Sequence, residues 1–421
     1  MTDIKPNLSN SYLPATFFLF FIISFIIGPA LLELSALLII ILIFYKNNEF
    51  LFSRNFLQSK FFFLYLFFVW ILISTFTNLV THEYLSSHKG FWYIRFLFFS
   101  IAISILFQNI KNLLIIKNII YLLIFFVVFD TFIQFILGKN IFGYPKLSNG
   151  RLSGIMNDEY IIGGVILKFL ILINFIYIIL YERKYKLNFI EIIFINLLSY
   201  VAITLTLERS SIILSSFYFL FSIFLLNINF KKKLLIFLSM LLIISTAVLT
   251  NQTLKKKFND SVNLFVSFKG NTDKSDISVP GYLAHFYSAA EIFLSRPITG
   301  TGIRSYRYEC KQYEVKETKF KYFIKKKILN NNKILNFDKN ICTTHPHHYF
   351  FEIISEIGLV GLLLYFILIF FLFLRSPKYL FPALIICFLP FVPTGSFFNN
   401  YNAYYIWFFL GIFLSHEKIK N

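Results

Sequence analysis

Long apolar blocks separated by short polar stretches make up most of this chain. A helix of about 20 apolar residues is long enough to cross a hydrocarbon core roughly 30 Å thick, and in lipid a helix satisfies all of its own backbone hydrogen bonds. Of the 421 residues, 57% are hydrophobic and only 14% are charged, so too little polar surface exists to cover a soluble protein. The sequence therefore predicts an all-α polytopic membrane protein.

Twelve apolar segments have the pattern of a membrane-spanning helix. They lie near residues 14–28, 30–45, 61–78, 91–107, 114–137, 161–180, 188–205, 211–227, 234–249, 349–374, 379–394 and 403–415. The first is interpreted as a mature span, because another apolar block follows closely and no small-residue cleavage site separates them. We expect about twelve transmembrane helices, arranged as a membrane bundle in 1–249, one large loop domain in 250–348 and a second bundle in 349–421.

The distribution of lysine and arginine predicts the orientation. With the N-terminus in the cytoplasm, every connection assigned to the cytoplasm carries Lys or Arg, whereas the late opposite connection "TGSFFNNYN" carries none. This asymmetry follows the positive-inside rule, from which long loops are exempt. The long loop 250–348 then lies outside the cytoplasm.

The net charge of +19 has a simpler explanation than nucleic-acid binding. The lysines lie mainly between the spans and in the long loop, and no nucleic-acid-binding motif accompanies them. Topology and anionic lipid headgroups account for this charge, so we expect membrane lipids as partners and no nucleic acid.

The long loop contains two cysteines, Cys310 and Cys342. In an oxidising compartment two loop cysteines favour a disulfide over a metal pair, and closing a loop of about 30 residues would stabilise it by about 3 to 4 kcal/mol. Two free buried thiols are the alternative. The basic, Asn-rich insertion "KKKILNNNKILNFDKN" between them is expected to be mobile.

Three histidines precede the apolar run after the loop, in "CTTHPHHYFFEIISEIGLVG". Pro346 suits the first turn of a helix, which would place His347 at the positive end of the helix dipole and keep its imidazole neutral, as a general base requires. Two other readings stay open: a polar cluster that caps the helix, and a metal site. The H-x-H-H spacing suits no standard zinc motif.

Charged residues inside spans are expensive in lipid and are usually paired or functional. Glu352 and Glu356 are four residues apart, so this face of the predicted helix is polar for two turns. Glu356 is nine residues from His347 and faces another side, so we expect it to tie the helix to a neighbouring helix. Arg95 and Asp130 are further charges within or near spans, and a structural role is favoured over a catalytic one, since either could pair between helices.

Three arginines lie on the predicted outer side: Arg209 in "TLERSSIIL", and Arg304 and Arg307 in "GIRSYRYEC". The planar, permanently charged guanidinium suits phosphate or pyrophosphate. Any one of them alone could be an interface anchor. Together with His347 they predict a site that binds a pyrophosphate leaving group and deprotonates a hydroxyl.

These segments resemble the O-antigen ligase and polymerase superfamily. "HPHHYFFEIISEIGLVG" is similar to the family signature H-N-x-x-L-x-x-x-x-E-x-G-x-x-G, with His347 at the histidine, Glu356 at the glutamate, and His348 where an asparagine is usual. "RPITGTGIRSYR", "LERSS", "RLSGIMNDEYIIGG" and "PTGSFFNNYN" resemble further family segments. The matches extend over 144–405.

The resemblance implies a metal-independent, inverting transfer of a glycan from undecaprenyl pyrophosphate to a hydroxyl on the periplasmic face, with no cofactor. It implies that His347 activates the acceptor and that Arg209, with Arg304 or Arg307, binds the pyrophosphate. In a ligase the acceptor is a lipid A-core sugar, and in a polymerase it is another lipid-linked repeat. The upstream block and the two loop cysteines favour the ligase.

The alternative from a different functional class is a flippase or other transporter of lipid-linked oligosaccharides. Such a transporter is expected to have charges deep in many spans and an internal repeat, whereas here the charges gather on one face and no repeat is visible. A membrane scaffold would not need a histidine and arginines on one side.

Overall fold

The computed structural model describes most of the apolar chain and part of the loop. The described residues are 13–46, 61–81, 88–109, 113–147, 150–225 except 158, 160, 183 and 187, then 229–250, 252, 255, 259, 276–279, 281–313, 334–337 and 342–415. The Asn-rich insertion predicted to be mobile lies outside them, apart from 334–337.

The described chain is almost entirely helical. Its α-helices are α1 (Leu13–Ile27), α2 (Pro29–Lys46), α4 (Phe62–Thr81), α5 (Lys89–Tyr93), α6 (Arg95–Asn109), α7 (Leu113–Leu137), α8 (Ile162–Glu182), α9 (Phe189–Leu205), α10 (Arg209–Leu225), α11 (Phe230–Thr250), α13 (Gly281–Ser295), α14 (Tyr306–Tyr313), α16 (Tyr349–Arg375), α17 (Phe381–Phe388) and α18 (Asn400–Ser415). The all-α expectation needs one correction, because β1 (Asp276–Val279) and β2 (Ile334–Phe337) form a short parallel pair.

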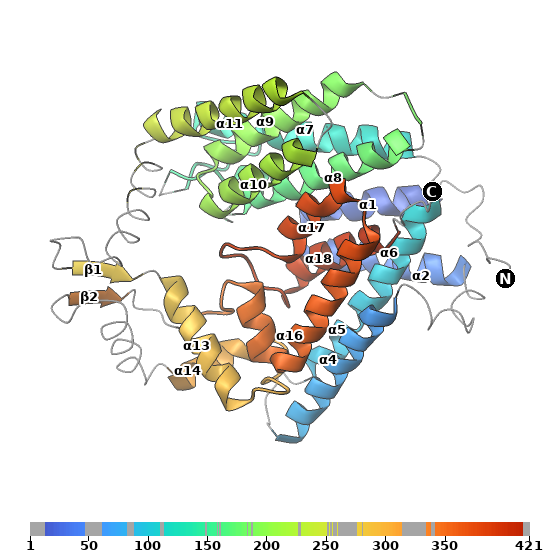
Figure 1. Cartoon of the computed structure of the whole chain (residues 1–421), viewed down its shortest axis with the longest axis vertical. Helices are drawn as coiled ribbons and strands as arrows, with labels where there is room; N and C mark the ends of the chain where they lie inside the picture. Colours follow the sequence, from blue (N-terminus) through green and yellow to red (C-terminus); the bar gives the residue numbers. More distant parts are fainter. Residues whose placement is uncertain are drawn as a thin grey trace.

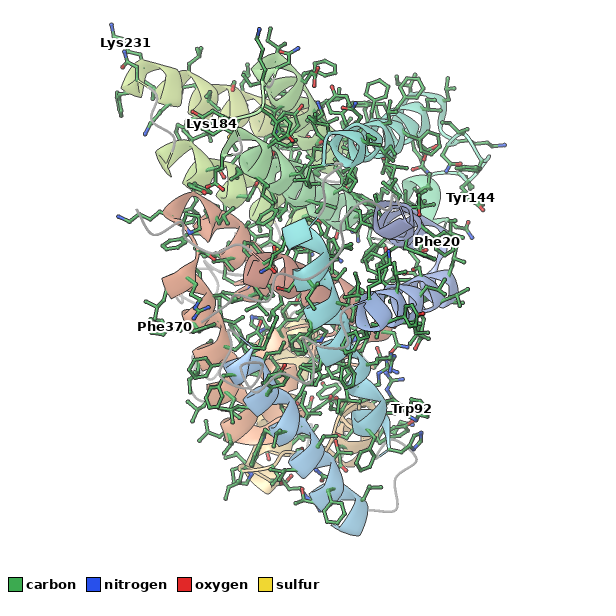
Figure 2. The ribbon with its side chains drawn as sticks, turned by 90° about the vertical axis from the view of Figure 1, so that its right-hand side faces the viewer. Phe20, Trp92, Tyr144, Lys184, Lys231 and Phe370 are labelled. Atoms are coloured by element: carbon green, nitrogen blue, oxygen red, sulfur yellow. A yellow bond between two sulfur atoms is a disulfide. The ribbon has the colours of Figure 1, made fainter. Side chains whose placement is uncertain are left out.

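Six of these helices are long and apolar enough to cross a membrane: α2, α4, α5 with α6, α7, α8 and α16. Shorter apolar helices lie in α1, α9, α10, α11 and α17. Large apolar side chains point outward, among them Trp92 and Phe370, which are 69% and 63% exposed (Figure 2), as expected of a surface that faces lipid. The chain is a multi-pass membrane protein by these criteria, and the count of twelve spans and their orientation stay predictions.

The helices form two groups in space. Helices α7 to α11 lie side by side as the upper layer of Figure 1, while α6, α18, α4 and α16 lie below it. Helix α13 packs against α14 and against α16, at the lower left of the same view. The loop segment is therefore placed against the beginning of α16.

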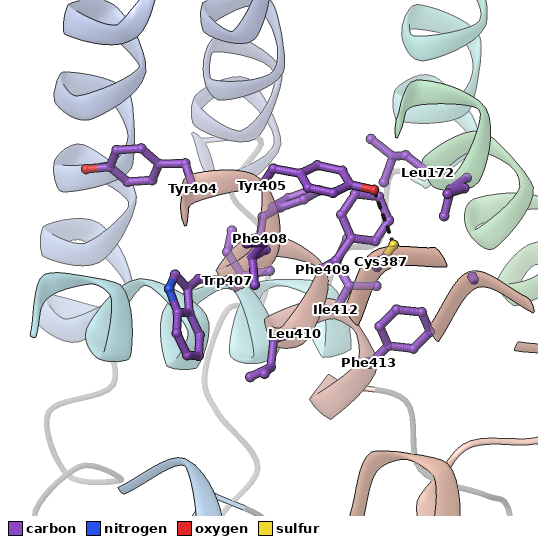
Figure 3. Packing of buried hydrophobic residues seen from close by; sticks show 14 of the residues in the cluster. Leu172, Cys387, Tyr404, Tyr405, Trp407, Phe408, Phe409, Leu410, Ile412 and Phe413 are labelled. Carbon is purple, nitrogen blue, oxygen red and sulfur yellow. Dashed lines mark hydrogen bonds between the residues drawn. The ribbon is translucent and has the colours of Figure 1, made fainter. Parts of the chain in front are cut away.

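The core is dense in aromatic side chains around α18. Trp407 is fully buried and donates from Nε1 to the Tyr93 hydroxyl at 2.8 Å, and that hydroxyl donates to the Phe397 carbonyl at 3.2 Å. Figure 3 shows the neighbouring Tyr404 and Phe408 in this packing. Tyr93 of α5 and Trp407 of α18 thus anchor the segment that precedes α18.

The predicted span at 379–394 is too long. Helix α17 ends at Phe388, and residues 389–399 continue without helix. Pro390 and Pro393 explain the end, since proline lacks a backbone N–H and disfavours helix at the residue before it. The segment 389–399 is free to turn back toward the start of α16.

Helix α16 is broken at Gly358, which has a φ of 73°. The break leaves carbonyl groups that need donors inside the apolar region. The Glu356 carbonyl accepts from the Gly302 N–H at 2.8 Å, and the Ile357 carbonyl accepts from Trp70 Nε1 at 2.9 Å. A loop segment and a side chain of α4 therefore complete the backbone hydrogen bonding of this helix.

For Arg95 and Asp130 a structural role was favoured, with pairing between helices as the possible arrangement. Arg95 pairs in this way, since its Nε lies 3.1 Å from Glu33 of α2. Asp130 has its partners in the loop instead: its carboxylate accepts from the Ile141 N–H at 2.9 Å and from Asn140. Asp130 holds the loop that follows its own helix.

Candidate functional site

His347 lies on a strained turn immediately before α16. Its φ is 56°, in the left-handed region that non-glycine residues seldom adopt. Its carbonyl accepts a hydrogen bond of 2.8 Å from the Thr394 N–H, which belongs to the segment 389–399. Strained backbone persists where the surroundings hold it, and such residues are frequent at functional sites.

His348 is the N-cap of α16. Its Nδ1 accepts from the Phe350 N–H at 3.3 Å, the role that an asparagine side chain commonly has at a helix start. This contact gives His348 a physical reason to stand where the signature has asparagine. The expectation for Pro346 was wrong, because this proline lies three residues before the first helical residue, outside the first turn.

Three imidazole rings gather at this turn. The ring centroid of His347 lies 4.1 Å from that of His345 and 5.5 Å from that of His285 on α13. Burial and the neighbouring His285 lower the pKa of His347 to about 4, and burial with the charges of His347, Arg307 and His285 lowers the pKa of His345 to about 3. His347 is therefore neutral near pH 7, as a proton acceptor must be.

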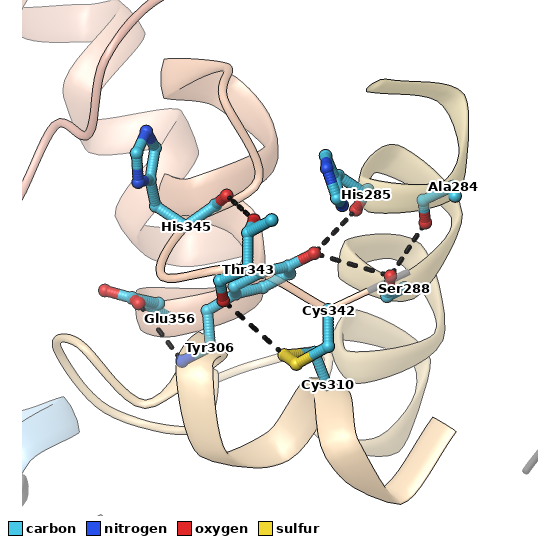
Figure 4. Close-up of a disulfide and its surroundings, with 9 residues drawn as sticks. All are labelled: Ala284, His285, Ser288, Tyr306, Cys310, Cys342, Thr343, His345 and Glu356. Atoms are coloured by element: carbon cyan, nitrogen blue, oxygen red, sulfur yellow. Dashed lines mark hydrogen bonds between the residues drawn. A yellow bond between two sulfur atoms is a disulfide. The ribbon is translucent and has the colours of Figure 1, made fainter. Parts of the chain in front are cut away.

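A disulfide joins Cys310 of α14 to Cys342, with the two Cα atoms 5.4 Å apart. It lies next to the buried Tyr306, whose hydroxyl donates to the His285 carbonyl at 3.2 Å and to Ser288 at 3.4 Å (Figure 4). The bridge and Tyr306 connect α13, α14 and the chain that leads to the histidines. The position of the histidine turn thus depends on covalent and hydrogen-bonded contacts within the loop.

Glu356 is buried and binds the backbone at the start of α14. Its carboxylate accepts from the Arg304 N–H at 2.6 Å and from the Tyr306 N–H at 3.2 Å. Glu356 therefore ties α16 to the first residue of α14 and to the turn that carries the arginines. A buried carboxyl group whose oxygens accept two backbone N–H groups has its hydrogen-bonding needs met in such a position.

Glu352, one turn earlier, binds a second segment in the same way. Its carboxylate accepts from Ser396 Oγ at 2.5 Å and from the Phe397 N–H at 2.6 Å. The polar face predicted for this helix is thus used to hold two segments, 304–306 and 396–397, against the start of α16.

The structure gives Arg304 and Arg307 different surroundings. Arg304 donates from Nε to the Phe398 carbonyl at 3.0 Å and from Nη2 to Asn400 Oδ1 at 2.6 Å. The Nε of Arg307 is buried and, among the described residues, has no hydrogen-bond partner. The charge of Arg307 is close enough to lower the pKa of His345. Arg304 is thus committed to protein groups, whereas Arg307 lies beside the histidines.

Arg209 is the first residue of α10 and is exposed. The preceding Glu208 accepts from the Gly164 N–H at the start of α8 at 3.1 Å, which fixes the hairpin. Helix α10 contacts the segment 389–399. The aromatic ring of Phe217 packs on that of Phe391, with the ring centroids 4.4 Å apart. The same segment carries the donor to His347. Phe217 lies eight residues after Arg209 in α10, so this contact does not place Arg209 itself at the histidine turn.

The metal reading of the histidines finds no support in the geometry. Across the part of the chain that the structure describes, no group of three or more His, Cys, Asp or Glu side chains is arranged to hold a metal ion. The absence of a metal from the reaction stays a prediction.

Sequence reasoning missed several residues at this site. His285 is a single histidine in an otherwise apolar and aromatic helical stretch, a pattern that could have drawn notice. For Glu352 the sequence predicted a position on a polar helix face but no residue that it would bind. Asn400 and Ser396 lie in the late connection whose resemblance was noted without individual roles. Their contacts come from segments far apart in the chain, and the sequence carries no signal of such pairings.

A comparison with protein families gives one match. Residues 194–366 match the family model described as O-antigen ligase. The matched range contains Arg209, Arg304, Arg307, Glu356 and His347, and it includes both cysteines of the disulfide. A search of curated proteins finds no match to the chain.

Proposed function

The chain carries a domain of the O-antigen ligase-like superfamily, and we propose that it transfers a glycan from undecaprenyl pyrophosphate to a lipid A-core sugar hydroxyl, as an O-antigen ligase. The transfer would invert the anomeric centre without metal or cofactor. The protein would lie in the bacterial inner membrane as about twelve spans, with residues 250–348 as the periplasmic domain and the site on that face.

The observation that carries this proposal is the neutral, half-buried His347 at the strained turn before α16. A neutral imidazole there would take the proton of the acceptor hydroxyl as this oxygen attacks the anomeric carbon. Backbone contact with Thr394 and the flanking rings of His285 and His345 hold the turn. No metal-bound nucleophile is required for such a step, since a positioned general base serves.

Arg307 is the better candidate of the two loop arginines for the pyrophosphate. Its buried Nε has no partner among the described residues, while the guanidinium of Arg304 already donates to Phe398 and Asn400. Arg209, on its hairpin at the start of α10, would supply the second guanidinium. Two guanidinium groups would compensate the charge that develops on the leaving pyrophosphate.

A reconstituted assay separates ligase from polymerase. The full chain in proteoliposomes receives an undecaprenyl-pyrophosphate glycan donor and either lipid A-core or a second lipid-linked repeat as acceptor. A ligase forms glycosylated lipid A-core, whereas a polymerase forms lengthened lipid-linked glycan. Formation of only the latter would overturn the ligase assignment and establish the alternative.

The same assay tests the base. His347→Ala is expected to lower transfer by about 100-fold or more, as removal of a general base does, while the protein remains folded by thermal unfolding. Transfer at the wild-type rate by a folded His347→Ala variant would exclude His347 as the base.

A further inference from the structure

The turn that follows α13, residues 294–302 with the sequence "LSRPITGTG", presents apolar side chains to the outside. Leu294 is 68% exposed and Ile298 is 63% exposed, and Pro297 between them is exposed as well. The sequence predicted this turn to lie in a loop domain outside the cytoplasm. Neighbouring apolar side chains of this size cost free energy in water, so they mark a surface that an apolar phase covers.

The turn lies beside two membrane helices and not beyond their ends. The Thr299 carbonyl accepts from Ser74 Oγ of α4 at 2.6 Å, and the Pro297 carbonyl accepts from the Leu359 N–H of α16 at 2.8 Å. Ser74 lies about 10 Å before the end of α4 and Leu359 lies about 15 Å after the start of α16, at 1.5 Å per residue. Figure 1 shows α13, α14 and the turn between them next to these two helices.

Both helices have an exposed apolar stripe that includes the level of the turn. The exposed positions recur every three or four residues, which is one face of a helix. They are Phe62, Leu66, Val69, Ile73, Phe76 and Leu79 on α4, and Leu359, Leu363, Phe366, Phe370 and Leu374 on α16. The stripe of α4 continues five residues past Ser74, and the stripe of α16 begins at the residue that binds the turn. The exposed surface of the turn is therefore level with the surface that these helices present to lipid.

The backbone of the turn meets a condition that applies inside a membrane. Non-helical backbone at membrane depth is tolerated only where the protein supplies its hydrogen bonds. The carbonyls of Arg296, Thr299 and Gly300 accept hydrogen bonds of 2.6 to 3.3 Å from other groups of the protein. The N–H groups of residues 300–302 donate hydrogen bonds of 2.8 to 3.1 Å to backbone carbonyls. This backbone does not depend on water for these contacts.

Arg296 is the only charged residue of 294–302. Its Nη1 donates to Oδ1 of Asn78 on α4 at 2.7 Å, and Asn78 is 1% exposed. A charged side chain near lipid is accommodated when it is directed to partners within the protein. Arg296 therefore does not prevent the turn from contacting lipid.

We propose that Leu294, Pro297 and Ile298 are embedded among the acyl chains of the bilayer, so that the loop domain enters the membrane at this turn. The continuity of this surface with the exposed stripes of α4 and α16 supports lipid as the occupant and not a second protein. The same turn contacts the break in α16 at Gly358, so its insertion would fix the depth of the segment that carries the loop arginines. The inference does not rest on the glycan transfer proposed above.

The experiment measures fluorescence quenching in liposomes. Leu294→Cys and Ile298→Cys are each labelled in detergent with a small thiol-reactive fluorophore, and the full chain is reconstituted. Quenching is measured with lipids brominated on their acyl chains and, separately, with iodide in the water. Cys310 and Cys342 form the disulfide and Cys387 is buried, so the unsubstituted chain gives the labelling background.

Two matched variants calibrate the signal: Phe76→Cys, on the exposed stripe of α4, and Lys311→Cys, on the exposed side of α14 in the loop. The labels at 294 and 298 are expected to lose emission with brominated lipid as the label at 76 does, and to keep it with iodide. Iodide quenching at either position equal to that at 311 would place the turn in water and overturn the proposal. Protection from both quenchers would mean that protein covers the surface, which would also overturn it. If one of the two variants does not fold, the other decides, and no measurement depends on transfer activity.

Discussion

The carboxylate of Glu356, inside the apolar helix α16, accepts a 2.6 Å hydrogen bond from the backbone N–H of Arg304 in the loop. The same carboxylate also binds the N–H of Tyr306. One side chain of a membrane helix thereby holds the turn that presents both loop arginines, and the membrane part and the loop part of the candidate site cannot be arranged independently.

Glu356→Ala is expected to destabilise the protein by about 2 to 6 kcal/mol, because it leaves one buried and one partly buried backbone N–H without acceptors and each costs about 1 to 3 kcal/mol. Glu356→Gln keeps one acceptor oxygen and should lie between Ala and the wild type. Thermal unfolding in detergent measures both. Equal melting temperatures for the three proteins would show that the carboxylate does not hold the turn.

Substitutions of the two loop arginines should have different effects on stability and on kinetics. Arg304→Ala is expected to lower the melting temperature, since Phe398 and Asn400 lose their donor. Arg307→Ala should leave it nearly unchanged but raise the KM for the glycan donor about tenfold or more, because the guanidinium proposed to bind the pyrophosphate is lost. Proteoliposome kinetics and unfolding of the same preparations make the comparison. The reverse assignment is supported if Arg304→Ala alone raises KM.

The pH profile reports the state of His347. Burial and His285 lower its pKa to about 4, so the ring stays neutral from pH 8 down through the ordinary imidazole value of about 6.5. The acid limb of kcat/KM, which reports the free enzyme, is therefore expected well below pH 6.5. In His285→Asn, which removes one cause of the lowered pKa, the limb should move upward. An acid limb at 6.5 or above in the wild type contradicts this account.

The stability of the folded protein should also decrease as the pH falls. The lowered pKa values of His345 and His347 mean that the unfolded chain takes up protons below pH 6.5 that the folded rings do not. Stability is then fully present above about pH 6.5 and is lost progressively as the pH falls toward 4. Unfolding at a series of pH values, compared with a His345→Asn, His347→Asn double variant, isolates this part of the acid sensitivity.

Gly358 and Gly361 form a matched pair on α16. A Cβ at Gly358 would lie 2.0 Å from the Ile298 carbonyl oxygen, and the φ of 73° is itself unfavourable for other residues. The atoms nearest to a Cβ at Gly361 belong to the Ile357 side chain rather than to backbone, and no positive φ adds strain there. Gly358→Ala is expected to destabilise by about 2 kcal/mol or more and Gly361→Ala by less, as measured by thermal unfolding. Similar losses of stability in the two variants would argue against close packing of the Ile298 carbonyl on the helix break at Gly358.

The sequence by itself determined the class of the protein and the identity of most candidate site residues. Apolar blocks predict helices because only helices and closed barrels satisfy the backbone in lipid, and every predicted segment coincides with a helix, although 379–394 was too long. His347, Arg209 and the cysteines were found from local motifs.

Only the tertiary structure decided what these residues contact. The sequence could not show that Glu356 holds Arg304, that Glu352 holds Ser396 and Phe397, or that His285 approaches His347. It could not distinguish Arg304, bound to Phe398 and Asn400, from Arg307 beside the histidines. The physical reason is that helix periodicity is a local property of the chain. Hydrogen bonds between segments 44 or more residues apart depend instead on how the helices pack.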